Sequence, residues 1–314
     1  MKPVRIGSRG SALALWQADF IADALRAMGC EASIQIIRTT GDRMQESSAP
    51  VPEGKGIFTR EIEEALLAGT IDLAVHSLKD LPTEIAPAFT LAAIPQRADA
   101  RDVLVSERYS SLADLPQGAV VGTGSPRRQV QLLRWRPDLK CIEFRGNVDT
   151  RLKKLAGGQA DAIVLAAAGL ERLRKTEWIR QRFPVEVLCP APGQGALAVE
   201  CRAGDPQTQA AIRPLDHAET RAAVAAERAF LAAMGGGCDA PVGAYCRCDA
   251  DGEWTLTAIA ALEPGVLATG EKRGPEPLVL AQSLAQDLLQ EPHQAQHHEL
   301  GEQRPASGRH GSGR

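Results

Sequence analysis

The spacing of apolar residues in the first part of the chain predicts strands and helices in alternation. Helices are predicted over residues 12–28 and 59–67, and strands at residues 4–6, 34–37 and 73–75. The first helix should present one apolar face, formed by Leu13, Trp16, Phe20 and Leu25. Ser11 stands just before it, where a capping residue is expected. Alternating strands and helices indicate an α/β fold with mainly parallel sheets.

The same order of elements recurs after residue 118, which predicts a second lobe similar to the first. Three segments match in the same order: residues 122–125 with 7–11, residues 145–149 with 38–42, and residues 158–164 with 69–75. Ligands of such sheets bind at the carboxyl ends of the strands, so we expect a cleft between the lobes. The side chains expected near it are those of Arg9, Asp80, Arg127 and Arg145.

The rest of the chain predicts a return to the first lobe and then a third domain. A proline and glycine hinge at residues 190–195 precedes a strand that returns to lobe 1, and an alanine-rich helix over residues 218–234 opens a smaller α+β domain. The predicted units are lobe 1 at 1–96 with 196–214, lobe 2 at 100–190, a C-terminal domain at 218–290, a mobile loop at 42–57 and a disordered tail at 291–314.

Composition excludes several classes of protein. The net charge of −3 gives no general attraction to nucleic acid or to anionic membranes, and no apolar stretch approaches membrane-spanning length. The seven cysteines lack CxxC spacing, so we expect reduced thiols, no disulfide framework and no metal site. These features, together with a start that lacks an apolar signal segment, predict a soluble cytoplasmic protein.

Two arginines stand at the predicted start of a helix. Arg127 and Arg128 follow Ser125 and Pro126, the combination of a capping residue and a proline in the first turn. Free backbone N–H groups and the helix dipole favour an anion at such a place, so the guanidinium groups predict a carboxylate or phosphate site. A solvated basic face is the alternative.

Two further residues suggest chemistry. Asp80, beside Lys79 at the end of an apolar strand, could do acid or base work on a nitrogenous substrate, although it could also form an ion pair or the turn before Pro82. Cys238 follows three glycines, so its thiol could carry a covalent group into a cleft, although most free cysteines are simply buried.

As a set, the motifs closely resemble those of the porphobilinogen deaminase family, also called hydroxymethylbilane synthases, from residue 4 to about residue 260. The matching runs are Arg5-Ile6-Gly7-Ser8-Arg9-Gly10-Ser11-Ala12-Leu13-Ala14-Leu15-Trp16-Gln17, Gly54-Lys55-Gly56-Ile57-Phe58, Val75-His76-Ser77-Leu78-Lys79-Asp80-Leu81-Pro82, Ser125-Pro126-Arg127-Arg128-Gln129, Phe144-Arg145-Gly146-Asn147-Val148, Ala191-Pro192-Gly193-Gln194-Gly195 and Gly236-Gly237-Cys238. Their common order makes an accidental match implausible.

The resemblance implies a monomer with three domains, of which two are α/β lobes like those of periplasmic binding proteins. It implies a transferase that condenses four porphobilinogen molecules, with release of ammonia, into linear hydroxymethylbilane, which passes to a downstream cyclising synthase. It also implies a dipyrromethane cofactor joined to Cys238 by a thioether, Asp80 as the catalytic carboxylate, and Lys55 and Phe58 in an active-site loop. The cofactor and substrate contacts implied are Arg9, Ser11, Lys79, Arg127, Arg128, Arg145, Arg151, Arg172 and Gln194.

Two other interpretations of the residues stay open. A two-lobed anion-binding protein would need the arginines and the cleft but neither Asp80 nor Cys238. A thiol-dependent acyl or glycosyl transferase would need a base that activates Cys238, and the sequence identifies none.

Overall fold

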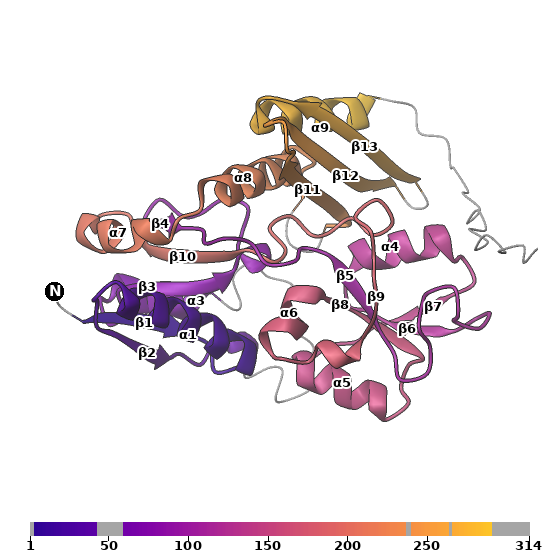
Figure 1. The fold of residues 1–314 in the computed structure, drawn as a ribbon, viewed down its shortest axis with the longest axis horizontal. Helices are drawn as coiled ribbons and strands as arrows, with labels where there is room; N and C mark the ends of the chain where they lie inside the picture. The colour runs from indigo at the N-terminus through magenta and orange to yellow at the C-terminus, as the bar shows by residue number, and fades with distance from the viewer. Residues whose placement is uncertain (1–2, 43–58, 237–239, 264–265, 291–314) are drawn as a thin grey trace, which may run out of the picture.

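The computed structural model describes residues 3–42, 59–236, 240–263 and 266–290, and the strands in these ranges form three sheets. Figure 1 shows two α/β lobes side by side and a smaller third domain above them. The chain crosses from the first lobe to the second after β4 and returns after β9. The fold class predicted from the sequence, two similar lobes plus a smaller C-terminal domain, is confirmed.

The first lobe is a sheet of five strands in the order β2-β1-β3-β10-β4. Its strands are β1 (Val4–Ser8), β2 (Ala32–Ile36), β3 (Leu73–Ser77), β4 (Phe89–Ala93) and β10 (Leu197–Arg202). Its helical segments with both ends in the described ranges are α1 (Ala12–Ala27), α3 (Arg60–Leu67), η1 (Leu78–Asp80), α7 (Pro206–Ile212) and η3 (Arg213–Leu215). Strands β2, β1 and β3 are parallel, and β10 runs antiparallel to both its neighbours.

The second lobe repeats this arrangement with the order β7-β6-β8-β5-β9. Its strands are β5 (Asp102–Val105), β6 (Val120–Gly122), β7 (Lys140–Ile142), β8 (Ala162–Ala166) and β9 (Ile179–Arg182). Its helical segments are α4 (Pro126–Trp135), α5 (Val148–Ala156), α6 (Ala167–Arg172) and η2 (Thr176–Trp178). Here too three strands are parallel, and β5, which enters from the first lobe, is antiparallel.

A pair of aspartates explains why the sequence repeat predicted the two lobes. The Asp72 carboxylate accepts a hydrogen bond from the backbone N–H of Arg5 at 2.9 Å, and the Asp161 carboxylate accepts one from that of Val120 at 2.8 Å. In each lobe this contact joins the start of one strand to the segment before the next parallel strand. The matching segments that contain Asp72 and Asp161 therefore have the same structural role in the two lobes.

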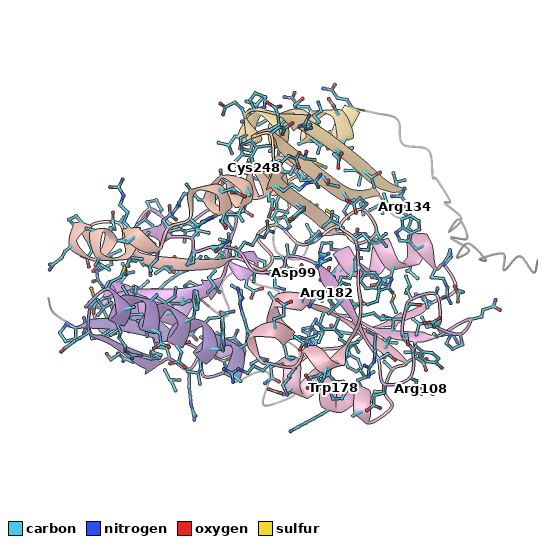
Figure 2. The ribbon with its side chains drawn as sticks, in the orientation of Figure 1. Asp99, Arg108, Arg134, Trp178, Arg182 and Cys248 are labelled. Atoms are coloured by element: carbon cyan, nitrogen blue, oxygen red, sulfur yellow. The ribbon has the colours of Figure 1, made fainter. Side chains whose placement is uncertain are left out.

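The two segments that cross between the lobes, residues 94–101 and residues 183–196, lie against each other. The backbone N–H of Ala98 donates to the carbonyl of Gly195 at 3.2 Å. Gly195 has a φ of 85°, and a Cβ there would lie 2.7 Å from the Ala98 oxygen, so only glycine fits this close approach. Nearby, Asp99 forms an ion pair of 2.9 Å with Arg182 of β9, and both are labelled in Figure 2.

The third domain packs two helices on one antiparallel sheet. It consists of α8 (Ala218–Ala233), β11 (Val242–Cys248), β12 (Trp254–Glu263), β13 (Val266–Gly274) and α9 (Pro277–Gln290). Phe230, Leu256 and Leu284 are among its buried core residues. The buried Glu227 carboxylate binds both Nη atoms of Arg97, at 2.6 and 3.0 Å, and so ties this domain to a crossing segment.

The apolar face predicted for α1 is partly wrong. The residues that the helix buries are Gln17, Ala18, Ile21, Ala22 and Leu25, whereas Phe20 is 44% exposed. Leu13, Trp16 and Phe20 form a neighbouring stripe, and Leu13 of that stripe lies close to Gly169 of α6 in the second lobe. The apolar pattern of α1 therefore combines residues of two faces, one packed on the sheet of its own lobe and one turned toward α6. In the described part of the chain no helix is long and apolar enough to span a membrane.

Candidate active site

The carboxyl ends of the parallel strands bring charged residues of both lobes together. Lys79 and Asp80 lie in η1, directly after β3. Arg127 and Arg128 lie in the first turn of α4, which follows β6, and Ser125 is the residue before the helix, as predicted. Because β10 is antiparallel, Gln194, just before it, reaches the same edge of the first sheet.

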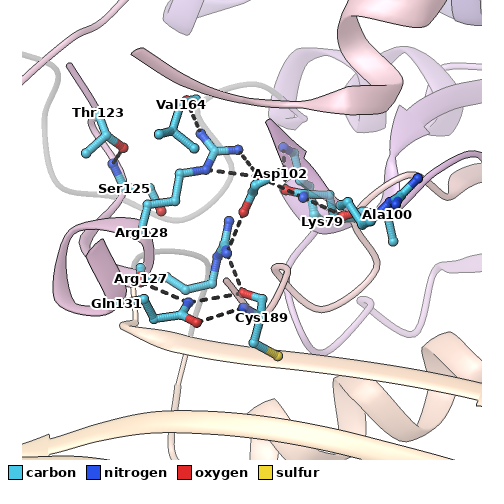
Figure 3. Close-up of polar contacts among 12 residues, drawn as sticks. Lys79, Ala100, Asp102, Thr123, Ser125, Arg127, Arg128, Gln131, Val164 and Cys189 are labelled. Carbon is cyan, nitrogen blue, oxygen red and sulfur yellow. Dashed lines mark hydrogen bonds and ion pairs between the residues drawn. The ribbon is translucent and has the colours of Figure 1, made fainter. Parts of the chain in front are cut away.

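A buried aspartate binds the two arginines of α4 (Figure 3). Asp102, at the start of β5, is fully buried and forms ion pairs of 2.8 Å with Arg127 and 2.7 Å with Arg128. Burial alone would raise the pKa of the Asp102 carboxyl, but the two guanidinium groups hold that pKa well below its usual range. The two guanidinium groups predicted to bind an anion are therefore paired with a carboxylate of the protein itself.

Gln194 connects this buried cluster to the first lobe. Its Nε2 donates to the Asp102 carboxylate at 2.9 Å and to the Ala100 carbonyl at 2.7 Å. Its Oε1 accepts from the Lys79 ammonium at 3.4 Å, a long contact. The side-chain amide of Gln194 therefore links Asp102 and Ala100 to Lys79, the residue next to Asp80.

Cations outnumber carboxylates in this region. Arg151, on α5, donates to the Gly146 carbonyl at 2.7 Å, and its charge is felt by both Arg128 and Asp80. Burial and the like charge of Arg128 lower the pKa of Arg151 to about 10. With Lys79 and Arg127, four cations lie within electrostatic range of the two carboxylates of this region, the exposed Asp80 and the buried Asp102. Such an excess of positive charge suits a ligand with several carboxylate groups.

The remaining residues implied by the resemblance lie at other points of the two lobes. Arg9 pairs with Asp42 at 2.5 Å, and the Ser11 hydroxyl accepts from the backbone N–H of Ala14 at 3.3 Å, which is a capping bond. Arg145 is largely exposed and hydrogen-bonds Glu143. Arg172 is buried where α6 approaches α1. These contacts of Arg9, Ser11 and Arg145 each lie within one lobe.

Three predicted residues cannot be placed in this way. Cys238, Lys55 and Phe58 lie outside the described residues, as do the predicted loop at 42–57, apart from Asp42, and the predicted tail at 291–314. In the described part of the chain no three His, Cys, Asp or Glu side chains are grouped as metal ligands.

Asp102 is the residue of this site that the sequence did not reveal. It opens the apolar strand run Val103, Leu104 and Val105, and a carboxylate in that position must be buried if the strand is central. A buried carboxylate requires a cationic partner, so this pattern could have predicted a buried cation beside Asp102, although not which one.

The lowered pKa of the Lys79 ammonium group predicts that the stability of the protein depends on pH. Burial, more than the like charges of Arg128 and Arg127, lowers the pKa of its ammonium from 10.5 to about 8, although Asp80 and Asp102 oppose the shift. Between pH 8 and 10.5 the unfolded chain then binds more protons than the folded one, so the contribution of Lys79 to the free energy of unfolding rises with pH. We expect Lys79→Met to increase stability at pH 7 and to flatten this rise in urea titrations.

The control for this experiment is Lys153→Met, on the exposed side of α5. It should leave the pH dependence of wild-type unfolding unchanged. If the free energy of unfolding of Lys79→Met rose with pH between pH 8 and 10.5 as steeply as that of the wild type, Lys79 would not be the group with the lowered pKa.

Comparison with known proteins agrees with this arrangement. Residues 4–210 match the family model described as porphobilinogen deaminase, dipyromethane cofactor binding domain, and residues 221–290 match the model of the porphobilinogen deaminase C-terminal domain. The porphobilinogen deaminase of Brevibacillus brevis is 46% identical over 91% of this chain and 93% of its own. That of Roseiflexus castenholzii is 49% identical over 90% of this chain and 95% of its own.

Among solved structures, a methionine binding protein is similar with a TM-score of 0.45 and 11% identity, over 72% of this chain and 93% of its own. The family models and the curated relatives both cover most of the sequence. On these grounds the chain belongs to the porphobilinogen deaminase family.

Proposed function

We propose that this protein is a transferase of tetrapyrrole synthesis, a hydroxymethylbilane synthase. It joins four porphobilinogen molecules head to tail, with loss of ammonia, on a dipyrromethane primer. The observation that carries the proposal is the excess of cations around Asp80 and Asp102, drawn from both lobes. Each pyrrole unit has an acetate and a propionate group, so a growing chain needs such surroundings.

The residues present fit a pyrrole primer with several carboxylates. Arg172 is buried, and within the part of the chain that the structure describes its Nε has no hydrogen-bond partner, which is consistent with a guanidinium that binds an anion. The residues that would hold the primer and the substrate are Arg9, Ser11, Lys79, Arg127, Arg128, Arg145, Arg151, Arg172 and Gln194, with Lys55 and Phe58 in the adjoining loop. Cys238 would anchor the primer by a thioether. When bound, the dipyrromethane supplies the pyrrole carbon to which the first substrate is joined.

Asp80 would do the acid and base work of the reaction. Its carboxylate would accept hydrogen bonds from the substrate pyrrole N–H and stabilise the cation left when ammonia departs. After the new carbon–carbon bond forms, the same carboxylate would assist removal of the proton from the reacting pyrrole carbon. Lys79, with a pKa of about 8, stays mostly protonated at neutral pH and would bind a substrate carboxylate.

Other parts of the proposal concern the chain as a whole. The domain limits would be 1–96 with 196–214, 100–190 and 218–290. The six described cysteines are free thiols, which agrees with a reducing compartment such as the cytoplasm. The protein would act as a monomer and pass its product to a downstream cyclising synthase.

The proposal is tested by the mass of the purified protein and by its turnover. Protein made in cells that supply porphobilinogen should carry extra mass equal to two linked pyrrole units, and it should convert porphobilinogen to ammonia and a linear tetrapyrrole. Cys238→Ser should lose both the extra mass and the activity. The matched control is Cys248→Ser in β11, a partly buried thiol that should leave both unchanged.

Two results would count against it. Extra mass that persisted in Cys238→Ser would refute the anchor. A wild-type protein that bound porphobilinogen without turnover and carried no extra mass would instead be an anion-binding protein.

A further inference from the structure

An aromatic pair on α1 lies outside the core of the first lobe. The rings of Trp16 and Phe20 stack with centroids 5.5 Å apart and planes 10° from parallel. The core side of α1 is formed by other residues, and Phe20 remains exposed. Large apolar side chains on a helix are usually buried in its own core, so this pair calls for another explanation.

The tryptophan of this pair contacts the second lobe. The guanidinium carbon of Arg172, the last residue of α6, lies 5.5 Å from the centre of the Trp16 ring. A Cβ on Gly169, one turn earlier in α6, would lie 3.9 Å from Leu13, three residues before Trp16. Two successive turns of α1 therefore contact α6, and α1 and α6 lie close together across the two lobes in Figure 1.

Arg172 is an unusual buried cation. It is only 9% exposed, its Nη2 donates to the Gly195 carbonyl at 2.7 Å, and its Nε is buried without a hydrogen-bond partner. The nearby carboxylate of Glu171 forms an ion pair with Arg182 instead. Among the described residues this buried guanidinium binds a carbonyl and an aromatic face but has no carboxylate partner, although a buried charge normally has one.

We propose that Trp16 is a positioning residue for Arg172. Its ring lies against the guanidinium across the lobe boundary, compensates part of the charge by a cation–π contact, and holds the guanidinium in place to bind a carboxylate of the pyrrole chain. Gly195, the other partner of Arg172, belongs to a crossing segment, so the same contact also joins α1 and α6 to the connection between the lobes. This inference rests on the function proposed above.

The test compares Trp16→Leu with Trp16→Phe in the cofactor-loaded protein. A cation–π contact of this kind predicts that Trp16→Leu raises KM for porphobilinogen about tenfold, with kcat within about threefold of wild type. Trp16→Phe keeps an aromatic face and should raise KM only two- to threefold, by the same estimate. The matched control Phe20→Leu removes the stacked neighbour, for which no contact with Arg172 is described, and should leave KM unchanged.

A merely structural role for Trp16 would lower the melting temperature and the amount of active protein, but not KM. The inference is overturned if Trp16→Leu keeps the wild-type KM, or if Phe20→Leu raises KM as much as Trp16→Leu does. Wild-type protein without turnover would contradict the proposed function, whereas active wild-type protein with an unaffected Trp16→Leu variant would contradict only the role of Trp16.

Discussion

Asp80→Asn is expected to reduce kcat by about three orders of magnitude while the protein keeps its fold and its covalent primer. The size follows from the loss of one positioned acid–base group, which typically costs 10²–10⁴ in rate. Asp80 is exposed at the end of η1, so its amide isostere should leave packing intact. The measurement is single-turnover and steady-state formation of hydroxymethylbilane, with intact mass as the check that the primer is present.

The control is Asp19→Asn, which removes an exposed carboxylate of α1 and should leave kcat unchanged. A second readout concerns Lys79, because the Asp80 charge raises the pKa of that ammonium. Without the charge, the pKa of Lys79 should fall further below its ordinary value. Turnover within a few fold of wild type in Asp80→Asn would exclude a catalytic role for Asp80.

Local patterns predicted the elements and their order well. The start of α4 at Pro126, with Ser125 before it, follows from local chemistry that any helix start obeys. The internal repeat was also visible, because Asp72 and Asp161 serve the same backbone contact in both lobes. The helix start depends on residues that are adjacent in the sequence, and the repeat is visible because the same motif occurs in both lobes.

Contacts between distant segments were not predictable in this way. Asp102 lies 26 positions before Arg128, and nothing local says that the two will meet. Trp16 and Phe20 fit a helical apolar pattern, yet periodicity cannot tell whether such a stripe faces its own sheet or the other lobe. The first contact depends on the order of strands within the second lobe, and the second on how the two lobes pack against each other.

Asp102→Asn is expected to lower the free energy of unfolding by about 3–5 kcal/mol, because it leaves buried guanidinium groups without their carboxylate. Asp102 is fully buried, and both Arg127 and Arg128 are at least nine-tenths buried. The surface pair of Asp23 and Arg26 provides the control, since its side chains are 74% and 48% exposed. Asp23→Asn should change the free energy of unfolding by less than about 1 kcal/mol. Urea unfolding at neutral pH measures both variants.

The pH dependence separates a charge effect from a packing effect. The folded pKa of Asp102 is lowered, so its contribution to stability is complete above the unfolded pKa of about 3.9 and is lost only as the pH falls through the folded value. The difference between wild type and Asp102→Asn should therefore stay constant from pH 5 upward until Lys79, whose pKa the Asp102 charge raises, begins to lose its proton. Added sulfate should stabilise the variant more than the wild type, because it can approach cations that have lost their internal anion. Equal stability of the two proteins at pH 7 would mean that Asp102 does not hold the arginine pair in place.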